Sequence, residues 1–228
     1  KEYLHKSGKR IPIELVVHAF YDTDGNVTHY YAFITDLTQR KQAEEKIRRQ
    51  IDYLTALQDI DRTIASAFGM KLSLKALTSK AISLLAVDAA AVMLVDFAAN
   101  TLQYAVGEGF RTDLSKAANI KLENGYASRV ALEQHIVKVP NPTDDPNNGF
   151  LTEFFKEDNF VNYHGAPLII KGKVVGVLEV FHRSFVKRDQ EWLDFFNALA
   201  GQAAIAVHNA ELIDNLQLSN DELIQAYD

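Results

Sequence analysis

The amino-acid sequence predicts a mixed α/β fold with hairpin-paired strands and long amphipathic helices, and two observations support this prediction. Two runs rich in Val, Ile and Leu, residues 167–170 and 173–181, meet at Lys171-Gly172, where glycine accepts the positive φ of a tight hairpin turn. The run after Asp189 then repeats apolar residues every three or four positions, which is the period of a helix with one buried face. That stripe consists of Trp192, Phe196, Leu199, Ala203, Ala206, Ala210 and Ile213.

The N-terminal residues predict a β-hairpin. Residues 11–21 and 27–35 are rich in Val, Ile, Tyr and Phe, and Asp24-Gly25 lies between them. Asp-Gly between two such runs is a strong hairpin signal. A second turn at Ser7-Gly8 gives three short strands before Asp36. We expect this segment to form a hairpin rather than an independent domain.

From Gln39 onward the pattern is helical. Apolar residues follow spacings of three and four, with charged residues between them, such as Glu44 and Arg48 in an i,i+4 pair. The length is typical of a coiled-coil linker, although one amphipathic helix packed on its own domain gives the same pattern. We favour a parallel homodimer through the terminal helices, because both ends carry such a helix. The residues expected to continue these stripes beyond the core of one domain are Ile47, Ile51 and Leu54 at one end and Ala206, Ala210 and Ile213 at the other. The first stripe consists of Ala43, Ile47, Ile51, Leu54, Leu57, Ile60, Ile64 and Phe68.

The middle of the chain alternates strands and short helices. We expect the terminal helices to cover one face of the sheet, whereas the short helices and a proline-rich loop over residues 140–149 roof the other face. A roof of this kind makes a pocket. The expected strands are 89–96, 101–105, 120–122 and 136–139, and the expected helices are 72–85, 126–133 and 150–159.

The composition excludes several classes of function. The 228 residues carry a net charge of −6 with no Lys/Arg cluster, which argues against a nucleic-acid or anionic-membrane surface. The absence of cysteine excludes disulfides, thiolate catalysis and cysteine-ligated zinc. No segment is long and apolar enough to span a bilayer and no signal peptide precedes Lys1, so we expect a cytoplasmic protein. The chain does not start with methionine, and we expect it to be a fragment of a longer protein.

Residues 53–228 resemble a GAF domain, the small α/β sensory module of signalling proteins. The resemblance implies an antiparallel sheet with the terminal helices on one face and a loop and helix roof over the other. It also implies that the chain senses or couples signals and is not an enzyme, since GAF domains rarely catalyse. The motifs that carry it are Val87-Asp88-Ala89-Ala90, Gly107-Glu108-Gly109-Phe110, Gly125-Tyr126-Ala127, Pro167-Leu168, Gly176-Val177-Leu178-Glu179 and the run AGQAAIA over 200–206.

Both ends of the chain carry further resemblances. Residues 8–41 resemble the C-terminal half of a PAS domain, with Asp36-Leu37-Thr38 at the point where PAS sheets hand over to a signalling helix. The first half of that fold is missing, so these strands are not a working PAS sensor. Residues 216–228 resemble the linker that leads, in some bacterial PAS–GAF proteins, into an HD-GYP phosphodiesterase acting on cyclic di-GMP. The chain itself contains neither a His-Asp pair nor a Gly-Tyr-Pro triplet.

These resemblances divide the chain into four predicted segments. Residues 1–38 are the C-terminal remnant of a PAS domain, and residues 39–56 form a linker helix. Residues 57–212 form the GAF domain, and residues 213–228 form an output linker helix.

The predicted pocket has six candidate ligand-binding residues. Five lie in segments expected to form the roof, and they combine aromatic walls with a few polar groups, as a small-ligand site requires. The sixth, Glu179, lies in an apolar strand on the same face as Val177 and Phe181. Alternatively, the aromatic residues fill the roof by themselves. Glu179 is either a polar anchor for a ligand or a structural group that pairs with Arg129 or a backbone donor. The roof residues are Tyr126, Arg129, Phe155, Tyr163 and His164.

No catalytic or metal-binding set is predicted. The histidines are scattered without ligand spacing, and no nucleophile-elbow pattern occurs. GAF domains that bind cyclic nucleotides carry a spaced motif of which this chain keeps only Phe185 and Asp189, and Asp189 is better explained as a helix N-cap. The GAF enzymes that reduce methionine sulfoxide use cysteines, which are absent. The sequence assigns no cofactor.

Taken together, these features predict a cytoplasmic bacterial sensory and signal-transmitting module. A small ligand or an upstream domain would act on a downstream output domain through a homodimer of terminal helices. The alternative is a dimerisation spacer whose GAF pocket is filled by its own side chains. Neither hypothesis includes a nucleic-acid or membrane partner.

Overall fold

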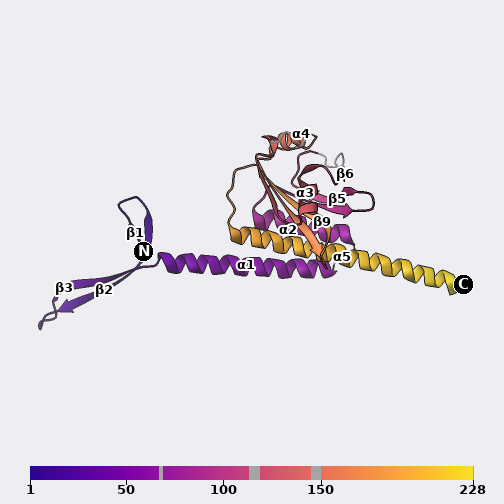
Figure 1. The fold of residues 1–228 in the computed structure, drawn as a ribbon. Coiled ribbons are helices and arrows are strands. Elements are labelled where there is room, and N and C mark those ends of the chain that lie inside the picture. The colour runs from indigo at the N-terminus through magenta and orange to yellow at the C-terminus, as the bar shows by residue number, and fades with distance from the viewer. Residues whose placement is uncertain (67–68, 113–118, 145–149, 228) are drawn as a thin grey trace. The chain divides into compact units, whose positions relative to one another are not determined.

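The computed structural model describes residues 1–66, 69–112, 119–144 and 150–227 (Figure 1). It divides into two compact units, Lys1–Leu54 and Thr55–Asp228, which are described separately.

The first unit is a three-stranded antiparallel sheet, as predicted. Its strands are β1 (Glu2–Leu4), β2 (Arg10–Tyr21) and β3 (Val27–Asp36), in that order across the sheet. In the β2–β3 turn, the Asp22 carboxylate accepts hydrogen bonds from the backbone N–H groups of Asp24 and Asn26, at 2.9 and 2.8 Å. At the end of β3, the Asp36 carboxylate accepts from the N–H of Thr38 at 2.7 Å, which satisfies a free donor where the next helix begins.

The long predicted helix is α1 (Thr38–Ser66). Its ion pair differs from the expected one, because Glu44 pairs with Arg40 at 2.8 Å, one turn earlier in the chain rather than one turn later. Within the first unit, the predicted apolar stripe faces solvent, since Ile47, Ile51 and Leu54 are all exposed. In the second unit, Ile60 of the same stripe is buried.

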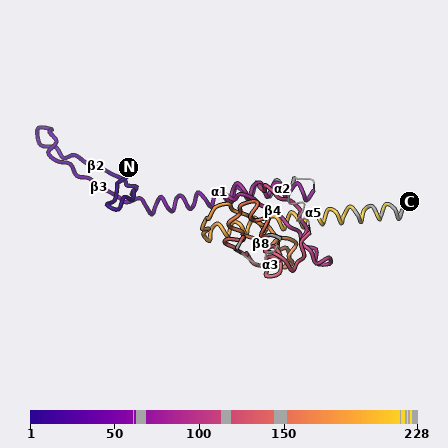
Figure 2. Tube along the Cα trace, turned by 90° about the horizontal axis from the view of Figure 1, so that it is seen from above, coloured from indigo at the N-terminus to yellow at the C-terminus, as the bar shows by residue number. Residues whose placement is uncertain are grey.

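The second unit is built on a six-stranded antiparallel sheet. The order across the sheet is β6-β5-β4-β9-β8-β7, so the hairpin turned at Lys171-Gly172 lies beside the central strand β4 (Figures 1 and 2). The strands are β4 (Ala89–Asp96), β5 (Thr101–Glu108), β6 (Asn119–Lys121), β7 (Val137–Pro140), β8 (Asn162–Ile170) and β9 (Lys173–His182).

The helices α2 (Met70–Leu85) and α5 (Gln190–Tyr227) cover one face of this sheet. Small residues on α5, such as Ala203, let the two helices pack closely, and the Trp192 indole N–H donates to the carbonyl of Leu85 at 3.0 Å. Ala206, which the sequence analysis placed on a dimer stripe, is buried in this core instead. Its position on α5 faces the sheet and α2 because the stripe of small residues is the packing surface of the domain itself.

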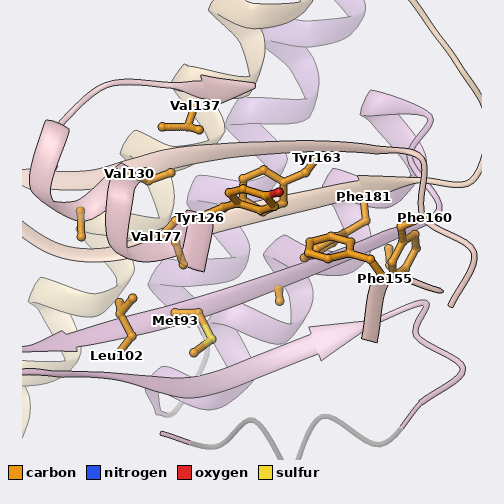
Figure 3. Packing of buried hydrophobic residues seen from close by; sticks show 14 of the residues in the cluster. Met93, Leu102, Tyr126, Val130, Val137, Phe155, Phe160, Tyr163, Val177 and Phe181 are labelled. Carbon is orange, nitrogen blue, oxygen red and sulfur yellow. The ribbon is translucent and has the colours of Figure 1, made fainter. Parts of the chain in front are cut away.

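The opposite face carries the roof, formed by α3 (Gly125–Glu133), α4 (Phe150–Glu157) and the short 3₁₀ helix Pro142–Asp144. Apolar and aromatic side chains fill the space between roof and sheet (Figure 3). They include Met93, Tyr126, Phe155, Tyr163 and Phe181.

One predicted boundary is wrong in a way that affects the site. The strand expected from Pro167 begins at Asn162, so Tyr163 and His164 lie in the sheet and not in the roof. Asn, His and Gly are weak strand formers, but β8 pairs with β7 on one side and β9 on the other over these residues. Two-sided pairing overrides the local propensity.

None of the described helices is both long and apolar enough to cross a lipid bilayer.

Candidate functional site

A small cavity lies between the central strands and the roof. Its volume is about 40 Å³, which is room for about three water molecules. Most of its wall is apolar, and seven of the thirteen described lining residues are aromatic. The lining residues are Ala91, Met93, Tyr104, Phe110, Ile120, Asn124, Tyr126, Ala127, Phe154, Phe155, Tyr163, Glu179 and Phe181.

The strand register explains why space remains above Glu179. In β9, Glu179 is paired with Ala91 of β4 on one side and with Gly165 of β8 on the other. Directly paired residues in a sheet point to the same face, so two small neighbours flank the carboxyl group. The floor of the cavity is therefore open beside Glu179 on the Ala91 side, whereas the Tyr163 side chain fills the space over Gly165.

Gly165 makes room for the Tyr163 ring. A Cβ atom at position 165 would lie 2.5 Å from the Tyr163 hydroxyl and 2.6 Å from Val130 of α3. The tyrosine side chain therefore leans along β8 over the glycine, beneath the roof helix. Its ring is fully buried, and its hydroxyl is a neighbour of the Glu179 carboxyl group.

Burial controls the protonation of both polar groups. It raises the pKa of Glu179 to about 7, and interaction with the Tyr163 hydroxyl acts in the opposite direction. Burial also raises the pKa of Tyr163 well above its usual value, and the neighbouring Glu179 adds to that effect. At neutral pH the tyrosine is uncharged and the glutamate is close to half ionised.

The aromatic wall is continuous. Tyr126 of α3 packs against Tyr163 with ring centroids 5.2 Å apart and against Phe155 of α4 at 5.7 Å (Figure 3). Phe181 of β9 contacts Phe155 at 5.9 Å and Phe110 at 5.2 Å. These contacts tie roof and sheet together through edge and tilted ring packing.

The structure brings four of the six predicted site residues together. Tyr126, Phe155, Tyr163 and Glu179 all line the cavity. Arg129 lies on α3, but its guanidinium is exposed and pairs with Glu133 at 3.5 Å, one turn along the helix. Whether these residues bind a ligand stays a prediction.

His164 was assigned to the wrong face. Alternation along β8 turns it away from Tyr163, toward α5, where its ring lies 5.0 Å from that of Trp192. This error follows from the wrong predicted start of β8, because strand alternation does not assign a face to a residue that is expected in a loop.

Several lining residues of the cavity were not predicted from the sequence. Strand alternation places Phe181 and Met93 on the same face as Glu179, so periodicity was sufficient to find these two. Phe110 and Asn124 lie outside regular strands and helices, and no local signal directs them to the cavity. Tyr104, Ile120 and Phe154 likewise come together through tertiary packing.

An ion pair beside the cavity fixes the end of α4 to the sheet. Asp158 is fully buried and accepts hydrogen bonds from Arg183 at 2.8 Å, from the N–H of Arg111 at 2.8 Å and from Thr112. The Arg183 guanidinium also donates to the carbonyl of Gly109 at 2.9 Å and lies 4.7 Å from the Phe160 ring centre. Burial by itself raises the pKa of Asp158, but these hydrogen bonds outweigh it and hold the pKa below its usual value.

Gly109 is required by this packing. Its φ is +86°, and a Cβ atom there would lie 2.2 Å from the backbone carbonyl oxygen of Asp88. The motif Gly107-Glu108-Gly109-Phe110 therefore brings the loop against the start of β4, which places Phe110 at the cavity wall.

The prediction that Asp189 is an N-cap is confirmed. Its carboxylate accepts the N–H of Trp192 at 2.9 Å at the start of α5. Phe185, the other retained residue of the cyclic-nucleotide motif, is exposed and does not line the cavity. Within the described residues, no group of three His, Asp or Glu side chains is arranged to hold a metal ion.

A model of the GAF domain matches residues 71–207, which is more than half of the chain. The chain belongs to the GAF-domain family. The matched residues contain every strand of the six-stranded sheet and the whole cavity.

A curated relative extends over the entire chain. It is the methyl sulfide methyltransferase-associated sensor of Methanosarcina acetivorans, which is 27% identical over 234 residues. The match covers 100% of this chain but only 23% of that protein, so the chain spans about a quarter of its length.

Solved structures with this fold come from proteins with different tasks. The GAF domain of a phosphoenolpyruvate-protein phosphotransferase from Coxiella burnetii has a TM-score of 0.63 at 19% identity, covering 72% of this chain and 98% of that one. The free methionine-R-sulfoxide reductase from Neisseria meningitidis, solved with its substrate, has a TM-score of 0.59 at 16% identity, covering 71% and 91%. At these identities the likeness shows the fold alone.

Proposed function

We propose that this chain is a sensory module in which the cavity above Glu179 binds a small ligand and α5 carries the response toward an output domain. The observation that carries the proposal is the Glu179 carboxyl group, which stands beside the Tyr163 hydroxyl in an aromatic cavity and has no basic partner among the described lining residues. A carboxyl group in an apolar space without a charged partner is costly, and a ligand of opposite charge would compensate for it. The sensor named among the relatives supports the same assignment.

Transmission would use the elements that touch both the cavity and α5. Strand β9 contributes Glu179 and Phe181 to the cavity, and the chain enters α5 eight residues after β9 ends. Arg183 follows β9 directly and holds the end of the roof helix α4. A ligand that shifts α4 would therefore also shift Arg183 and the segment that joins β9 to α5. The domain would then have two arrangements, one with and one without ligand, as a signalling module requires.

The finer assignments belong to the same proposal. The terminal helices would pair in a parallel homodimer, residues 1–38 would be the remnant of a PAS domain, and the output would be a separate domain such as a cyclic di-GMP phosphodiesterase. We also propose that the module is not an enzyme. The thiols used by the cysteine-dependent GAF reductases are absent from its sequence.

A second candidate function is a spacer with a filled cavity, and the cavity volume favours it. At about 40 Å³ the space excludes a nucleotide or any ligand of similar size unless the roof moves. In that case the aromatic residues would be packing alone.

Hydrogen–deuterium exchange on the 228-residue chain separates the two functions. A sensor must open its roof to admit a ligand, so the amides of α4 should exchange at least about tenfold faster than those of the central strand β9. The amides of α2, which packs on the opposite face of the same sheet, serve as the internal control for unfolding of the domain. Protection of α4 equal to that of β9 would identify a spacer and overturn the sensor proposal.

A further inference from the structure

The cavity carries an acidic group without a basic partner. Of the described lining residues, none is Lys, Arg or His, and Glu179 is the one carboxyl group. Arg129 of the neighbouring roof helix has its charge exposed and paired with Glu133. An ionised carboxylate in an apolar space requires a counter-charge, and the protein supplies none inside the cavity.

The aromatic walls of the cavity favour a positively charged ligand, as Glu179 does. The faces of Phe and Tyr rings are negative, and they attract cations that lie within about 6 Å of the ring centre. Tyr126, Phe155, Tyr163 and Phe181 surround the space beside Glu179, with neighbouring ring centroids 5.2 to 6.3 Å apart. An anion would meet the Glu179 carboxylate, so this cavity disfavours phosphate and carboxylate ligands.

The volume of the cavity further restricts the class of ligand. A volume near 40 Å³ accepts a compact group of few non-hydrogen atoms, and the floor beside Glu179 is made of small residues such as Ala91. A large flat or extended cation would exceed this volume.

We propose that the cavity recognises a compact organic cation of the methylated-ammonium class, with Glu179 as its counter-ion and the aromatic rings as its cage. The inference rests on the proposed function and names the class of ligand for that sensor. A cation would form an ion pair with the ionised carboxylate and would lose little by leaving water, because alkylated ammonium groups are weakly hydrated.

The ionisable groups that face Glu179 set the pH response. They are Tyr163 from β8, Tyr126 from α3 and Tyr104 from β5, and Arg129 of α3 lies outside the cavity lining. The residues that β4 and α4 contribute do not titrate; they are Ala91, Met93, Phe154 and Phe155. Because burial raises the pKa of Tyr163 well above its usual value, Glu179 governs the response between pH 6 and pH 8. With a pKa of about 7, its ionised fraction rises about tenfold over that range, and the affinity for a permanent cation should rise by the same factor.

The test uses tetramethylammonium chloride as the probe, titrated calorimetrically into the intact chain at pH 6 and pH 8, with sodium chloride holding ionic strength constant. Tert-butanol, a neutral molecule of similar shape, is titrated alongside. Tetramethylammonium should bind about tenfold more tightly at pH 8 than at pH 6, whereas tert-butanol should show no pH dependence. Equal binding of the two probes at pH 8, or tetramethylammonium binding that ignores pH, would overturn the inference.

Two variants test whether Glu179 causes the pH dependence of cation binding. Glu179→Gln should abolish the pH dependence and the preference for the cation, and Glu153→Gln, on the exposed side of the roof helix α4, should leave both unchanged. If Glu179→Gln fails to fold, the pH dependence of tetramethylammonium binding to the unmodified chain still tests the proposal. Failure of tetramethylammonium to bind, together with an α4 helix that exchanges rapidly, would reject the cation class and leave the sensor proposal standing. A protected α4 would reject the sensor instead.

Discussion

Two buried imidazoles lie on the face of the sheet that is opposite to the cavity. His164 and His182 pack with ring centroids 5.5 Å apart and against Trp192 of α5. Nδ1 of His164 and Nε2 of His182 have no hydrogen-bond partner among the described residues. Burial lowers the pKa of each ring to about 4, helped for His164 by its neighbour and for His182 by Arg188.

This pair should make the domain sensitive to acid. A histidine whose pKa falls from 6.5 in the unfolded chain to about 4 in the fold contributes its full stability above pH 6.5 and loses it as the pH falls toward 4. Glu179 responds in the opposite direction, because its raised pKa stabilises the fold below pH 4.5 and that contribution is lost as the pH rises through about 7. The two responses overlap, so variants are needed to separate them.

We predict that His182→Gln reduces the loss of unfolding free energy between pH 6.5 and pH 4 by on the order of 2–3 kcal/mol. Urea denaturation at several pH values measures it. His135→Gln is the matched control, because it removes an imidazole that is exposed. An unchanged slope for His182→Gln would mean that the imidazole has the same pKa in the folded and the unfolded chain.

At the scale of secondary structure, the buried ion pair between Asp158 and Arg183 contrasts with the exposed pair between Arg129 and Glu133. The first has an acidic partner with no exposed surface, whereas the second lies on the surface of α3. Removing one partner of a buried pair leaves an uncompensated charge, but exposed pairs contribute little.

We therefore predict that Arg183→Met lowers the unfolding free energy by about 3–5 kcal/mol, and that Arg129→Met lowers it by less than about 1 kcal/mol. Guanidinium denaturation of the two variants gives the comparison. The loss at Arg183 should also speed amide exchange in α4, because this side chain holds the end of that helix at Asp158. Similar costs for the two variants would show that the buried pair does not fasten the roof.

Most elements of the second unit could be predicted from the sequence, since long stripes and glycine turns are local signals. The helix N-cap at Asp189 and the hairpin at Lys171-Gly172 follow directly from residue chemistry. The start of β8 could not be predicted, because its residues are strand-forming only in the company of β7 and β9.

The site could be predicted in part for the same reason. Glu179 and Tyr126 were found because one stands out in an apolar strand and the other lies in a recognisable motif. Phe110 reaches the cavity through the close approach of Gly109 to Asp88, a contact between residues about twenty positions apart. Such contacts depend on tertiary packing and leave no periodic signal.

At the scale of the whole molecule, both terminal helices expose apolar side chains that the described fold does not cover. On α1 these are Ile47, Ile51 and Leu54, and on α5 they include Leu212, Ile213 and Leu216, the last being 70% exposed. The α5 set lies beyond the alanines that pack in the core, so the exposed stripe begins where the domain's own packing ends. Stripes of this kind are typical of helices that pair with a second copy.

We predict that the chain is a parallel dimer through these helices. Light scattering at micromolar concentration should report twice the chain mass of 25.6 kDa. The double substitution Ile51→Glu and Ile213→Glu should shift the protein to monomer, because each apolar side chain buried at a seam contributes about 2 kcal/mol and a charge there adds repulsion between the copies. Leu132→Glu is the matched control, since Leu132 is equally exposed on α3 but lies on neither terminal helix, and it should leave the mass unchanged. A monomeric wild-type chain, or a monomer produced by Leu132→Glu, would place the signal path within one chain and reject pairing of the terminal helices.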